Sequence, residues 1–433
     1  MDQISQLMHF LNQAPTAWHA VAHIEEQLKL HGFQQLNEGD KWAIQPGTGY
    51  FVTRDGSSLC AFITPLQAPR AAQILASHTD SPGFKVKPQP EIRKSEAVLL
   101  GVEIYGAPLL ASWLNRDLGI AGRIVTIDRA GKTHTHLVSL KHVPLVIPQL
   151  AIHLDREANE KGVILNKQEH VQALAGLIQD LPKDKTYLET IFKEVLGEAH
   201  LLTFDLFLFP LEQARLLGLN HQLLASYRID SLVSVHAILH ALLYHSTPSE
   251  EVMKMAIFWN HEEIGSHSAS AAASPFFNTT LERVVWALGL SREEYLRILT
   301  QSHCISVDLG HAVHPNYPDK HDPQHPLFLG KGAVLKSNAQ MRYATEASSA
   351  TLIEAAAHLE KLPLQRFSGR NDIPSGSTIG PIFSTVSGIP TVDMGISQLS
   401  MHSARELIAC RDYLELCRLL ACTFNLRNPH SAG

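Results

Sequence analysis

The sequence predicts an α/β fold that is interrupted by an inserted second domain. Short apolar runs bounded by turn residues alternate with helix-like stretches near both ends of the chain, which is typical of α/β proteins. Between residues 91 and 228 this alternation gives way to paired β segments, which indicates an insertion. We therefore expect one domain built from residues 1–90 and 229–433 and a second built from residues 91–228.

Length and composition narrow the class of protein. The chain has 433 residues, of which 45% are hydrophobic, and is long enough for two domains. Its net charge of -6 gives no support to a nucleic-acid partner, and no run reaches the roughly 18 apolar residues of a membrane span. The first residues lack the pattern of a secretory signal. Five cysteines without a Cys-x-x-Cys pair indicate reduced thiols in a cytoplasmic protein, so a metal ion would need His, Asp and Glu as ligands.

The N-terminal segment is predicted to form one amphipathic helix and two buried strands. Ala17–Leu30 has its apolar residues at helical spacing and is followed by Gly32 as a stop signal. Leu59–Thr64 and Ile74–Ser77 are compact apolar runs between turn residues, and we interpret both as strands.

His78 and Asp80 follow the second of these strands. Residues two apart in a strand project to the same face, so the two side chains suit a metal-binding histidine and an acid beside it. A structural histidine with a capping aspartate explains the same two residues equally well, because buried polar groups generally find partners.

The insertion is predicted to be rich in β structure. Ala97–Gly106, Arg123–Asp128 and Thr135–Leu140 have the composition of strands, and a turn joins the last two. Tyr187–Leu196 is helix-like.

Two adjacent acids, Glu262 and Glu263, follow the apolar strand Met255–Trp259. Ligands in α/β proteins usually bind beyond the carboxyl ends of strands. Neighbouring side chains point to opposite faces, so one acid could bind a metal ion while the other acts as a base toward water. A solvated acidic turn is the simpler reading of the pair taken alone.

Asp230 and Asp308 are two more acids at the ends of elements. Asp230 opens the strongly apolar helix Leu232–Tyr244, where an aspartate is most often a cap of the helix N-terminus. Asp308 directly follows the strand Cys304–Val307 and so repeats the pattern seen at His78 and Glu262.

The C-terminal part continues the alternation of helices and strands. We predict three helices and one strand there, at Leu281–Leu288, Ser348–Leu359, Arg405–Phe424 and Pro390–Met394. The irregular loop His311–Pro326 should lie over a surface or a site mouth. Asn371–Gly380 is a turn that leads into a short helix, and His402, before the last helix, reads on its own as a cap-region residue.

Five of these positions form a candidate metal centre when they are taken together. They are histidines and carboxylates at strand ends or helix starts: His78, Asp230, Glu263, Asp308 and His402. Such a set can hold a pair of zinc ions if one carboxylate bridges them. The spacing alone does not prove this geometry, because the positions are scattered over most of the chain.

The sequence resembles the aspartyl aminopeptidase family of di-zinc metallopeptidases. The resemblance extends over essentially the whole chain, and its most specific part is the string His-Ala-Val-His-Pro-Asn-Tyr at 311–317. Its other matching segments are His78–Pro82, Ile229–Asp230, His261–Ser266, Val334–Asn338, Gln340–Ala344, Asn371–Asp372, Gly376–Pro381 and Met401–Ser403.

The resemblance implies a fold, a cofactor and a role for each candidate residue. The implied fold is an α/β catalytic domain with a central sheet, and the implied cofactor is two zinc ions per chain. One zinc would be held by His78 and Asp308 and the other by Glu263 and His402, with Asp230 bridging, Glu262 as general base and Asp80 orienting His78.

The resemblance also implies a substrate and an assembly. The expected reaction is removal of an N-terminal Asp or Glu from a peptide. Lys336 would contact the acidic side chain with help from Tyr343, and His153 would reach into the site of a partner subunit. The inserted domain would mediate dimerisation, and relatives assemble further into tetrahedral dodecamers.

Three residues depart from the pattern of the family. Ser231 stands where an asparagine usually follows the bridging aspartate, Asn260 where an aspartate is frequent, and Gln149 where a histidine is usual. None of these changes removes a candidate ligand. Two other functions stay open: a di-metal exopeptidase of broad or neutral specificity, and a catalytically idle shell or cargo protein.

Overall fold

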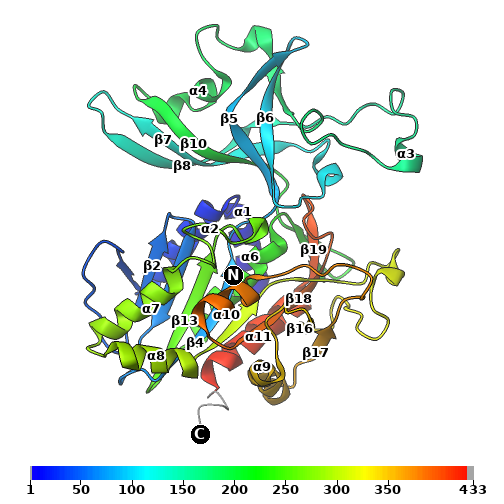
Figure 1. The fold of residues 1–433 in the computed structure, drawn as a ribbon. Coiled ribbons are helices and arrows are strands. Elements are labelled where there is room, and N and C mark those ends of the chain that lie inside the picture. The colour runs from blue at the N-terminus through cyan, green and yellow to red at the C-terminus, as the bar shows by residue number, and fades with distance from the viewer. Residues whose placement is uncertain (1, 427–433) are drawn as a thin grey trace.

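The computed structural model describes residues 2–426, and its strands form two sheets. The larger sheet has 13 strands and belongs to the lower body in Figure 1, while the second has six strands and lies above it. This division agrees with the predicted α/β domain and β-rich insertion.

The larger sheet contains strands from both ends of the chain. Its main path runs in the order β1 (Gln34–Leu36), β2 (Gly49–Arg54), β3 (Ser58–Ile63), β13 (Val252–Trp259), β4 (Ala71–His78), β14 (His303–Val307), β18 (Thr391–Leu399), β19 (Glu406–Ala409), β12 (Leu223–Ser226) and β11 (Arg215–Leu217). Three short strands lie off this path: β15 (Gly310–His311), β16 (Ala333–Lys336) and β17 (Leu364–Phe367).

Four neighbouring strands at the centre of this sheet are parallel. β13 pairs with β4, β4 with β14, and β14 with β18, all in the same direction. The register aligns Trp259 with His78 and Val307 with Met394. Because parallel strands end at one edge of the sheet, the residues that follow all four are brought close together.

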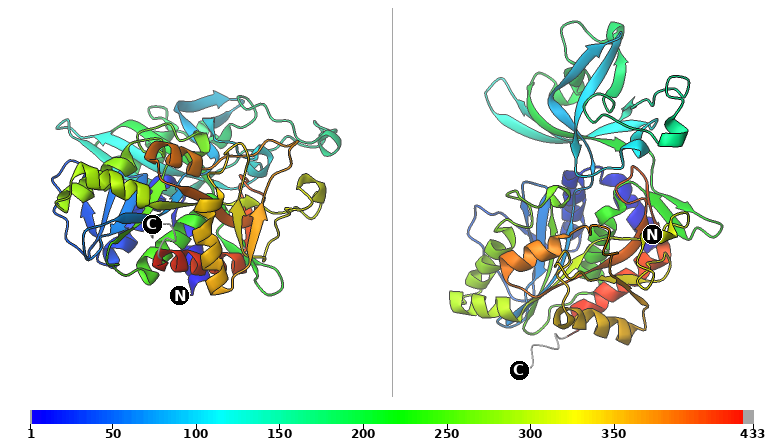
Figure 2. Two further views of the ribbon diagram at one scale, coloured as in Figure 1. Left: turned by 60° about the horizontal axis from the view of Figure 1, so that its bottom comes forward. Right: turned by 45° about the vertical axis from the view of Figure 1, so that its right-hand side comes forward.

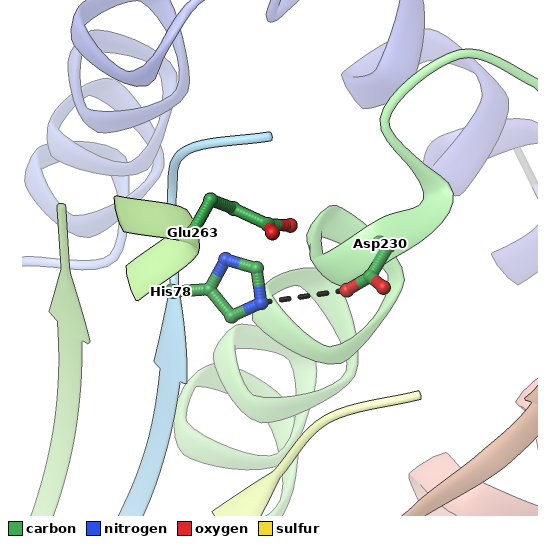
Figure 3. A group of neighbouring side chains, drawn as sticks. All are labelled: His78, Asp230 and Glu263. Atoms are coloured by element: carbon green, nitrogen blue, oxygen red, sulfur yellow. Dashed lines mark ion pairs between the residues drawn. The ribbon is translucent and has the colours of Figure 1, made fainter. Parts of the chain in front are cut away.

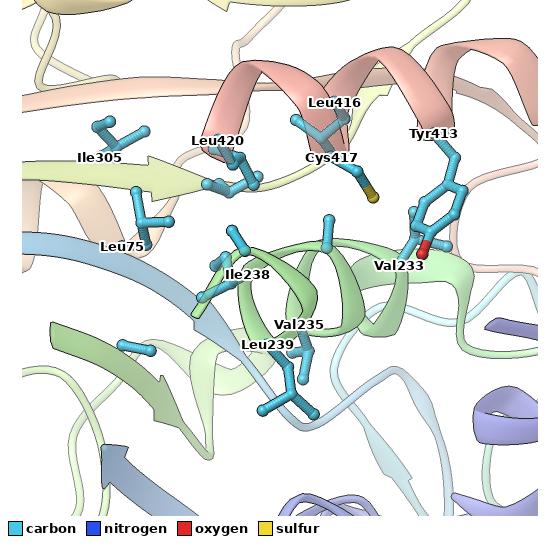
Figure 4. Packing of buried hydrophobic residues seen from close by; sticks show 14 of the residues in the cluster. Leu75, Val233, Val235, Ile238, Leu239, Ile305, Tyr413, Leu416, Cys417 and Leu420 are labelled. Atoms are coloured by element: carbon cyan, nitrogen blue, oxygen red, sulfur yellow. The ribbon is translucent and has the colours of Figure 1, made fainter. Parts of the chain in front are cut away.

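Helices cover both faces of the larger sheet, because its central strands are buried along almost their whole length and present apolar residues to both faces. On β4, Leu75 packs into the core on one face, and Ile74 packs into the core on the other. The first face is covered by α1 (Gln3–Gln13), α2 (Ala17–Leu30), α6 (Ile229–His245), α9 (Ala347–Glu360) and α11 (Cys410–Asn425). The second is covered by α7 (Phe276–Ala287), α8 (Arg292–Gln301) and α10 (Ile379–Ser387). Figure 4 shows α6 and α11 packed against each other over Leu75 and Ile305.

The inserted domain is an antiparallel sheet with its own apolar core. The strand order is β8 (Thr133–Leu145), β7 (Leu118–Ile127), β10 (His200–Pro210), β5 (Gly83–Lys94), β6 (Ala97–Tyr105) and β9 (Ala173–Leu177). Its short helices are α3 (Ala158–Lys161), α4 (Tyr187–Ile191) and α5 (Lys193–Leu196). Trp113, which is fully buried, packs at the centre of this core against Phe84. Figure 2 shows the segment that carries α3 extending to the side of the sheet.

The second sheet begins and ends earlier in the chain than residues 91 and 228. It starts with β5 at Gly83 and finishes with β10 at Pro210, after which β11 and β12 pair with the larger sheet. The chain therefore returns to the larger sheet before α6.

Charged residues connect the two bodies. Arg123 of β7 donates to both carboxylate oxygens of Asp55, which follows β2, and to Asp205 of β10. The guanidinium carbon of Arg123 also lies 4.9 Å from the ring centroid of Trp18 on α2. Ion pairs that are partly shielded from water and share one arginine fix orientation better than isolated surface pairs.

Most predicted elements are confirmed, and two are corrected. The expected terminal helix from Arg405 is wrong at its start, because Glu406–Ala409 forms β19 and the helix begins at Cys410. Pairing of β19 with β12 and β18 overrides the local helical pattern. The helix-like Tyr187–Leu196 is divided at Phe192 into α4 and α5. Among the described residues, no helix has the length and hydropathy needed to cross a membrane.

Candidate metal centre

The candidate ligands meet beyond the carboxyl ends of the four parallel strands. His78 is the last residue of β4, and Asp308 directly follows β14. Glu263 lies in a turn of 3-10 helix, Glu262–Ile264, after β13, and His402 lies in the bend between β18 and β19. Asp230 approaches the same point from the first turn of α6.

His78 lies within reach of three carboxylates. Its Nε2 is 3.4 Å from Asp230 Oδ1 and 3.5 Å from Asp308 Oδ1. Its Nδ1 faces the other way, toward Asp80, at 3.1 Å from the backbone oxygen and 3.5 Å from the carboxylate Oδ1. A ring whose far nitrogen is held by a neighbouring residue presents its other nitrogen in a fixed direction, as metal-binding histidines do.

Asp230 stands between two pairs of candidate ligands. Its Oδ1 faces His78, as Figure 3 shows, while its Oδ2 is 3.9 Å from His402 Nε2. His402 Nε2 is in turn 3.4 Å from Glu263 Oε2. One oxygen of Asp230 is therefore directed to each pair, which is the arrangement that a bridging carboxylate needs.

Asp80 acts as an acceptor for the segment that carries the two glutamates. Its Oδ1 accepts from the Glu262 N–H and its Oδ2 from the Glu263 N–H, both at 3.1 Å. The hydroxyl of Tyr105, the last residue of β6, donates to Oδ2 at 2.7 Å. The inserted domain thus contributes a direct hydrogen bond to the support of the centre.

The centre concentrates negative charge in a buried place. Burial, with Asp308 and Asp80 adding to it, raises the pKa of Glu262 to about 8. Burial and the neighbouring Glu262 raise the pKa of Glu263, while burial and Asp308 raise that of Asp230. Carboxyl groups behave in this way when no cation compensates their charge.

At Asp308 and His78, by contrast, the surroundings favour the charged form of the side chain. Burial alone would raise the pKa of Asp308, but the adjacent Lys336 and His78 hold it far below its ordinary range. Burial would lower the pKa of His78, yet the carboxylates of Asp230, Asp308 and Asp80 raise it.

The residues fit zinc as a bound metal. His78, Asp230 and Glu263 offer ligand atoms that all lie within 4.8 Å of one another. Asp230 Oδ1 is buried and forms no hydrogen bond within the described part of the chain. Imidazole nitrogens and carboxylate oxygens are suitable zinc ligands, and divalent ions would compensate the excess charge.

A cavity of about 140 Å³ opens onto this cluster. The candidate ligands, Glu262, Lys336 and Tyr343 are all among the residues that line it. Lys336 is 2% exposed, and its Nζ donates to Asp308 Oδ2 at 3.3 Å and to the Leu309 carbonyl at 2.6 Å. The Tyr343 ring centroid lies 5.4 Å from the same ammonium group.

Two predicted site residues, Asp80 and His153, do not line this cavity. Asp80 lies behind His78 and the glutamate turn, which it holds by hydrogen bonds, whereas His153 is remote from them. His153 lies in an exposed turn of the inserted domain, on the segment that leads to α3. Whether it serves a neighbouring subunit is a question of assembly and stays a prediction.

Three residues that hydrogen-bond to residues of the centre were not among the predicted site residues. Tyr105 binds Asp80, Gln398 Nε2 donates to Asp230 Oδ2 at 3.2 Å, and Glu406 accepts from the backbone N–H of both Asp230 and His402. Their partners are between 4 and 176 positions away in the sequence, and the more distant pairings leave no local signal.

The departures from the family pattern leave these contacts in place. Asn260 Oδ1 accepts from the His261 N–H at 2.9 Å, and Ser231 Oγ lies 3.2 Å from Ser77 Oγ. Gln149 is exposed and pairs with Asn115 on the inserted domain. None of the three contacts a candidate ligand through its side chain.

An α/β sheet with histidines and carboxylates gathered beyond its parallel strands defines a metal-dependent hydrolase. Comparison with known proteins identifies the family to which this hydrolase belongs. Residues 10–424 match the family model described as Aminopeptidase I zinc metalloprotease (M18). The chain belongs to the M18 family of zinc aminopeptidases, as its sequence led us to expect.

Individual relatives cover nearly the full length of the chain. A probable M18 family aminopeptidase 2 from Pseudomonas syringae pv. syringae is 40% identical over 423 residues, which are 96% of each protein. One from Streptomyces avermitilis is 40% identical over 410 residues, or 94% of each.

Solved structures agree with the fold. A chain of the Ape4 and Nbr1 complex superposes with a TM-score of 0.93 at 33% identity, covering 98% of this chain and 85% of that one. The Saccharomyces mApe1 dodecamer gives a TM-score of 0.84 at 25% identity, with 99% and 97% covered.

The position of Asp230 generates a prediction about metal content. Asp230→Asn removes a charge that faces both pairs of candidate ligands, so the purified variant should retain less zinc than the wild type. Elemental analysis after dialysis measures this. Asp393→Asn is a matched control, because Asp393 is equally buried but binds Thr378 Oγ1 and the Ala344 N–H instead. Two tightly held zinc ions in Asp230→Asn would show that Asp230 is not a bridge.

Proposed function

We propose that this chain is a di-zinc aminopeptidase that removes Asp or Glu from the N-terminus of peptides. The observation that carries the proposal is Asp230, whose two oxygens face two separate pairs of candidate ligands. His78 and Asp308 would hold one ion, Glu263 and His402 the other, and Asp230 both. When bound, the zinc ions would supply the Lewis acidity that activates water and polarises a carbonyl group.

Glu262 is the proposed general base. It precedes the candidate ligand Glu263 in the same turn, and Asp80 fixes this turn by accepting hydrogen bonds from the backbone N–H of both residues. Its own carboxylate accepts no hydrogen bond from the residues that the structure describes, so its oxygens are free to take a proton. In the proposed reaction it accepts the proton of the attacking water and passes it to the leaving amine.

Lys336 is the proposed determinant of acidic specificity. The cavity is lined by many carboxylates, so a negatively charged substrate side chain needs a cation there. A lysine ammonium has three N–H donors, and two of those of Lys336 point to Asp308 and Leu309. The third is available to a substrate carboxylate, and the hydroxyl of the neighbouring Tyr343 is proposed as a second donor.

The inserted domain is proposed to join subunits. The segment around His153 exposes several apolar side chains, with Leu150 at 57%, Leu154 at 75% and Ile164 at 81% exposure. Apolar residues gathered in this way usually mark a surface that another protein covers. A related protein, Saccharomyces mApe1, is a dodecamer. We propose a dimer that assembles further, in the cytoplasm, where the five cysteines would stay reduced as free thiols.

The role of Glu262 generates a prediction about turnover. Glu262→Gln should lower kcat by roughly 10²–10⁴-fold, because a positioned acid/base group contributes that much. Its zinc content should stay near that of the wild type, since Glu262 is not among the proposed ligands. Steady-state kinetics and elemental analysis of one preparation test both statements. A variant with wild-type kcat would refute the assignment of the base.

The proposed contact of Lys336 generates a prediction about specificity. Lys336→Met should strongly depress kcat/KM for peptides with N-terminal Asp or Glu and change slow cleavage of Leu peptides little. Lys331→Met is the control, because Lys331 is exposed and precedes the same strand. An unchanged ratio of Asp to Leu cleavage in Lys336→Met would mean that another residue selects the acid.

The location of His153 generates a prediction about assembly. If His153 completes the site of a partner subunit, His153→Ala and Glu262→Gln chains should each be poorly active alone. Hybrid dimers formed by mixing them should regain one working site. His142→Ala, a change at another exposed histidine of the insertion, should leave activity intact. Proven exchange of subunits without recovered activity would count against a shared site.

A further inference from the structure

We propose that Glu406 is a positioning residue that fixes the main chain at Asp230 and His402 and thereby sets the affinity of the centre for its metal ions. The inference rests on the proposed zinc centre but concerns a residue outside its ligand set. Glu406 is the first residue of β19 and is 2% exposed.

A single carboxylate connects the two ligand-bearing segments. Glu406 Oε2 accepts a hydrogen bond from the Asp230 N–H at 2.9 Å, and Oε1 accepts one from the His402 N–H at 2.6 Å. Asp230 is the second residue of α6, and His402 lies in the bend after β18, so no regular element joins them directly.

Both N–H groups need an acceptor that regular secondary structure does not supply. The Asp230 N–H is in the first turn of a helix, where backbone donors have no partner within the helix. His402 has a φ of +65°, in the left-handed region that costs a residue with a side chain free energy. A buried donor without an acceptor is strongly destabilising, so the Glu406 carboxylate supports both conformations.

The direction of the two side chains depends on these main-chain positions. Asp230 Oδ2 and His402 Nε2 are 3.9 Å apart, on either side of the space that a metal ion would share. Zinc ligands must lie within a few tenths of an ångström of their final positions, at about 2.0–2.2 Å from the ion. If the segments were loose, part of the binding free energy would be lost in ordering them.

Asp80 provides the same kind of support to another part of the centre. It accepts from the N–H groups of Glu262 and Glu263, while Glu406 accepts from those of Asp230 and His402. Each carboxylate thus uses one oxygen for each of two backbone N–H groups; those bound by Asp80 belong to one turn, and those bound by Glu406 belong to two separate segments. An amide in place of either carboxylate keeps only one acceptor oxygen, and its NH₂ would face a second donor.

The test compares Glu406→Gln with Asp412→Asn in the full chain. Asp412 is fully buried, and its two oxygens accept from the N–H groups of Gly330 and Gly332 at 2.7 Å each, in a place that touches no candidate ligand. Both substitutions break one of two carboxylate-to-amide hydrogen bonds, so both should lower Tm. Only Glu406→Gln should lower zinc affinity, by about 10–100-fold, as changes to residues that hold ligands typically do.

Zinc affinity is measured by competition with a graded series of chelators, with bound zinc determined directly rather than through activity. In parallel, kcat of Glu406→Gln should recover when zinc is in excess, and KM should stay near the wild-type value. Glu406→Asp, which keeps both oxygens on a shorter side chain, should show an intermediate loss of affinity and replaces Glu406→Gln if that variant does not fold.

Two results distinguish a failure of this inference from a failure of the proposed zinc centre. Wild-type zinc affinity in Glu406→Gln and Glu406→Asp, with a fall in Tm like that of Asp412→Asn, would overturn the inference and leave Glu406 a purely structural residue. Absence of zinc binding by the wild-type protein would refute the proposed centre itself.

Discussion

The accumulation of buried carboxylates at one edge of the sheet is the constraint on which the rest of the site depends. Five acids surround His78: Asp80, Asp230, Glu262, Glu263 and Asp308. Uncompensated charges of one sign are expensive to bury, and here the cations within the protein are few. Lys336 pairs with Asp308, and backbone N–H groups bind Asp80 and Glu406. The remaining charge on Asp230 and Glu263 makes this edge suited to divalent cations.

The central sheet provides this arrangement because its strands are parallel. Each strand delivers one residue or one short turn to the same edge, so His78, Glu263 and Asp308 come together although they are far apart in sequence. Helix α6 adds Asp230 from one face of the sheet. The carboxylates of Asp80 and Glu406 then tie the loops to one another through the main chain, which leaves the ligand side chains free.

The sequence allowed the candidate metal ligands to be predicted, but not the residues that hold them in place. His78 and Asp308 follow apolar runs directly, and Glu263 comes shortly after one, so their position beyond strand ends could be inferred from pattern alone. Asp230 and His402 read locally as cap residues; they joined the candidate metal centre only when all five positions were taken together, and the family resemblance gave each its role. Tyr105 and Gln398 could not be found, because each acts through a contact between distant parts of the chain. Glu406 was assigned to the terminal helix, since its true partner in the sheet, β12, lies far upstream.

The hydrogen bond from Tyr105 to Asp80 has a consequence for biosynthesis. The centre draws on both bodies of the protein and on nearly the whole chain, from His78 to Glu406. A nascent chain that has completed β4 and even the insertion still lacks His402 and the carboxylate that holds it. The proposed metal centre therefore becomes complete only when translation of the chain is almost finished.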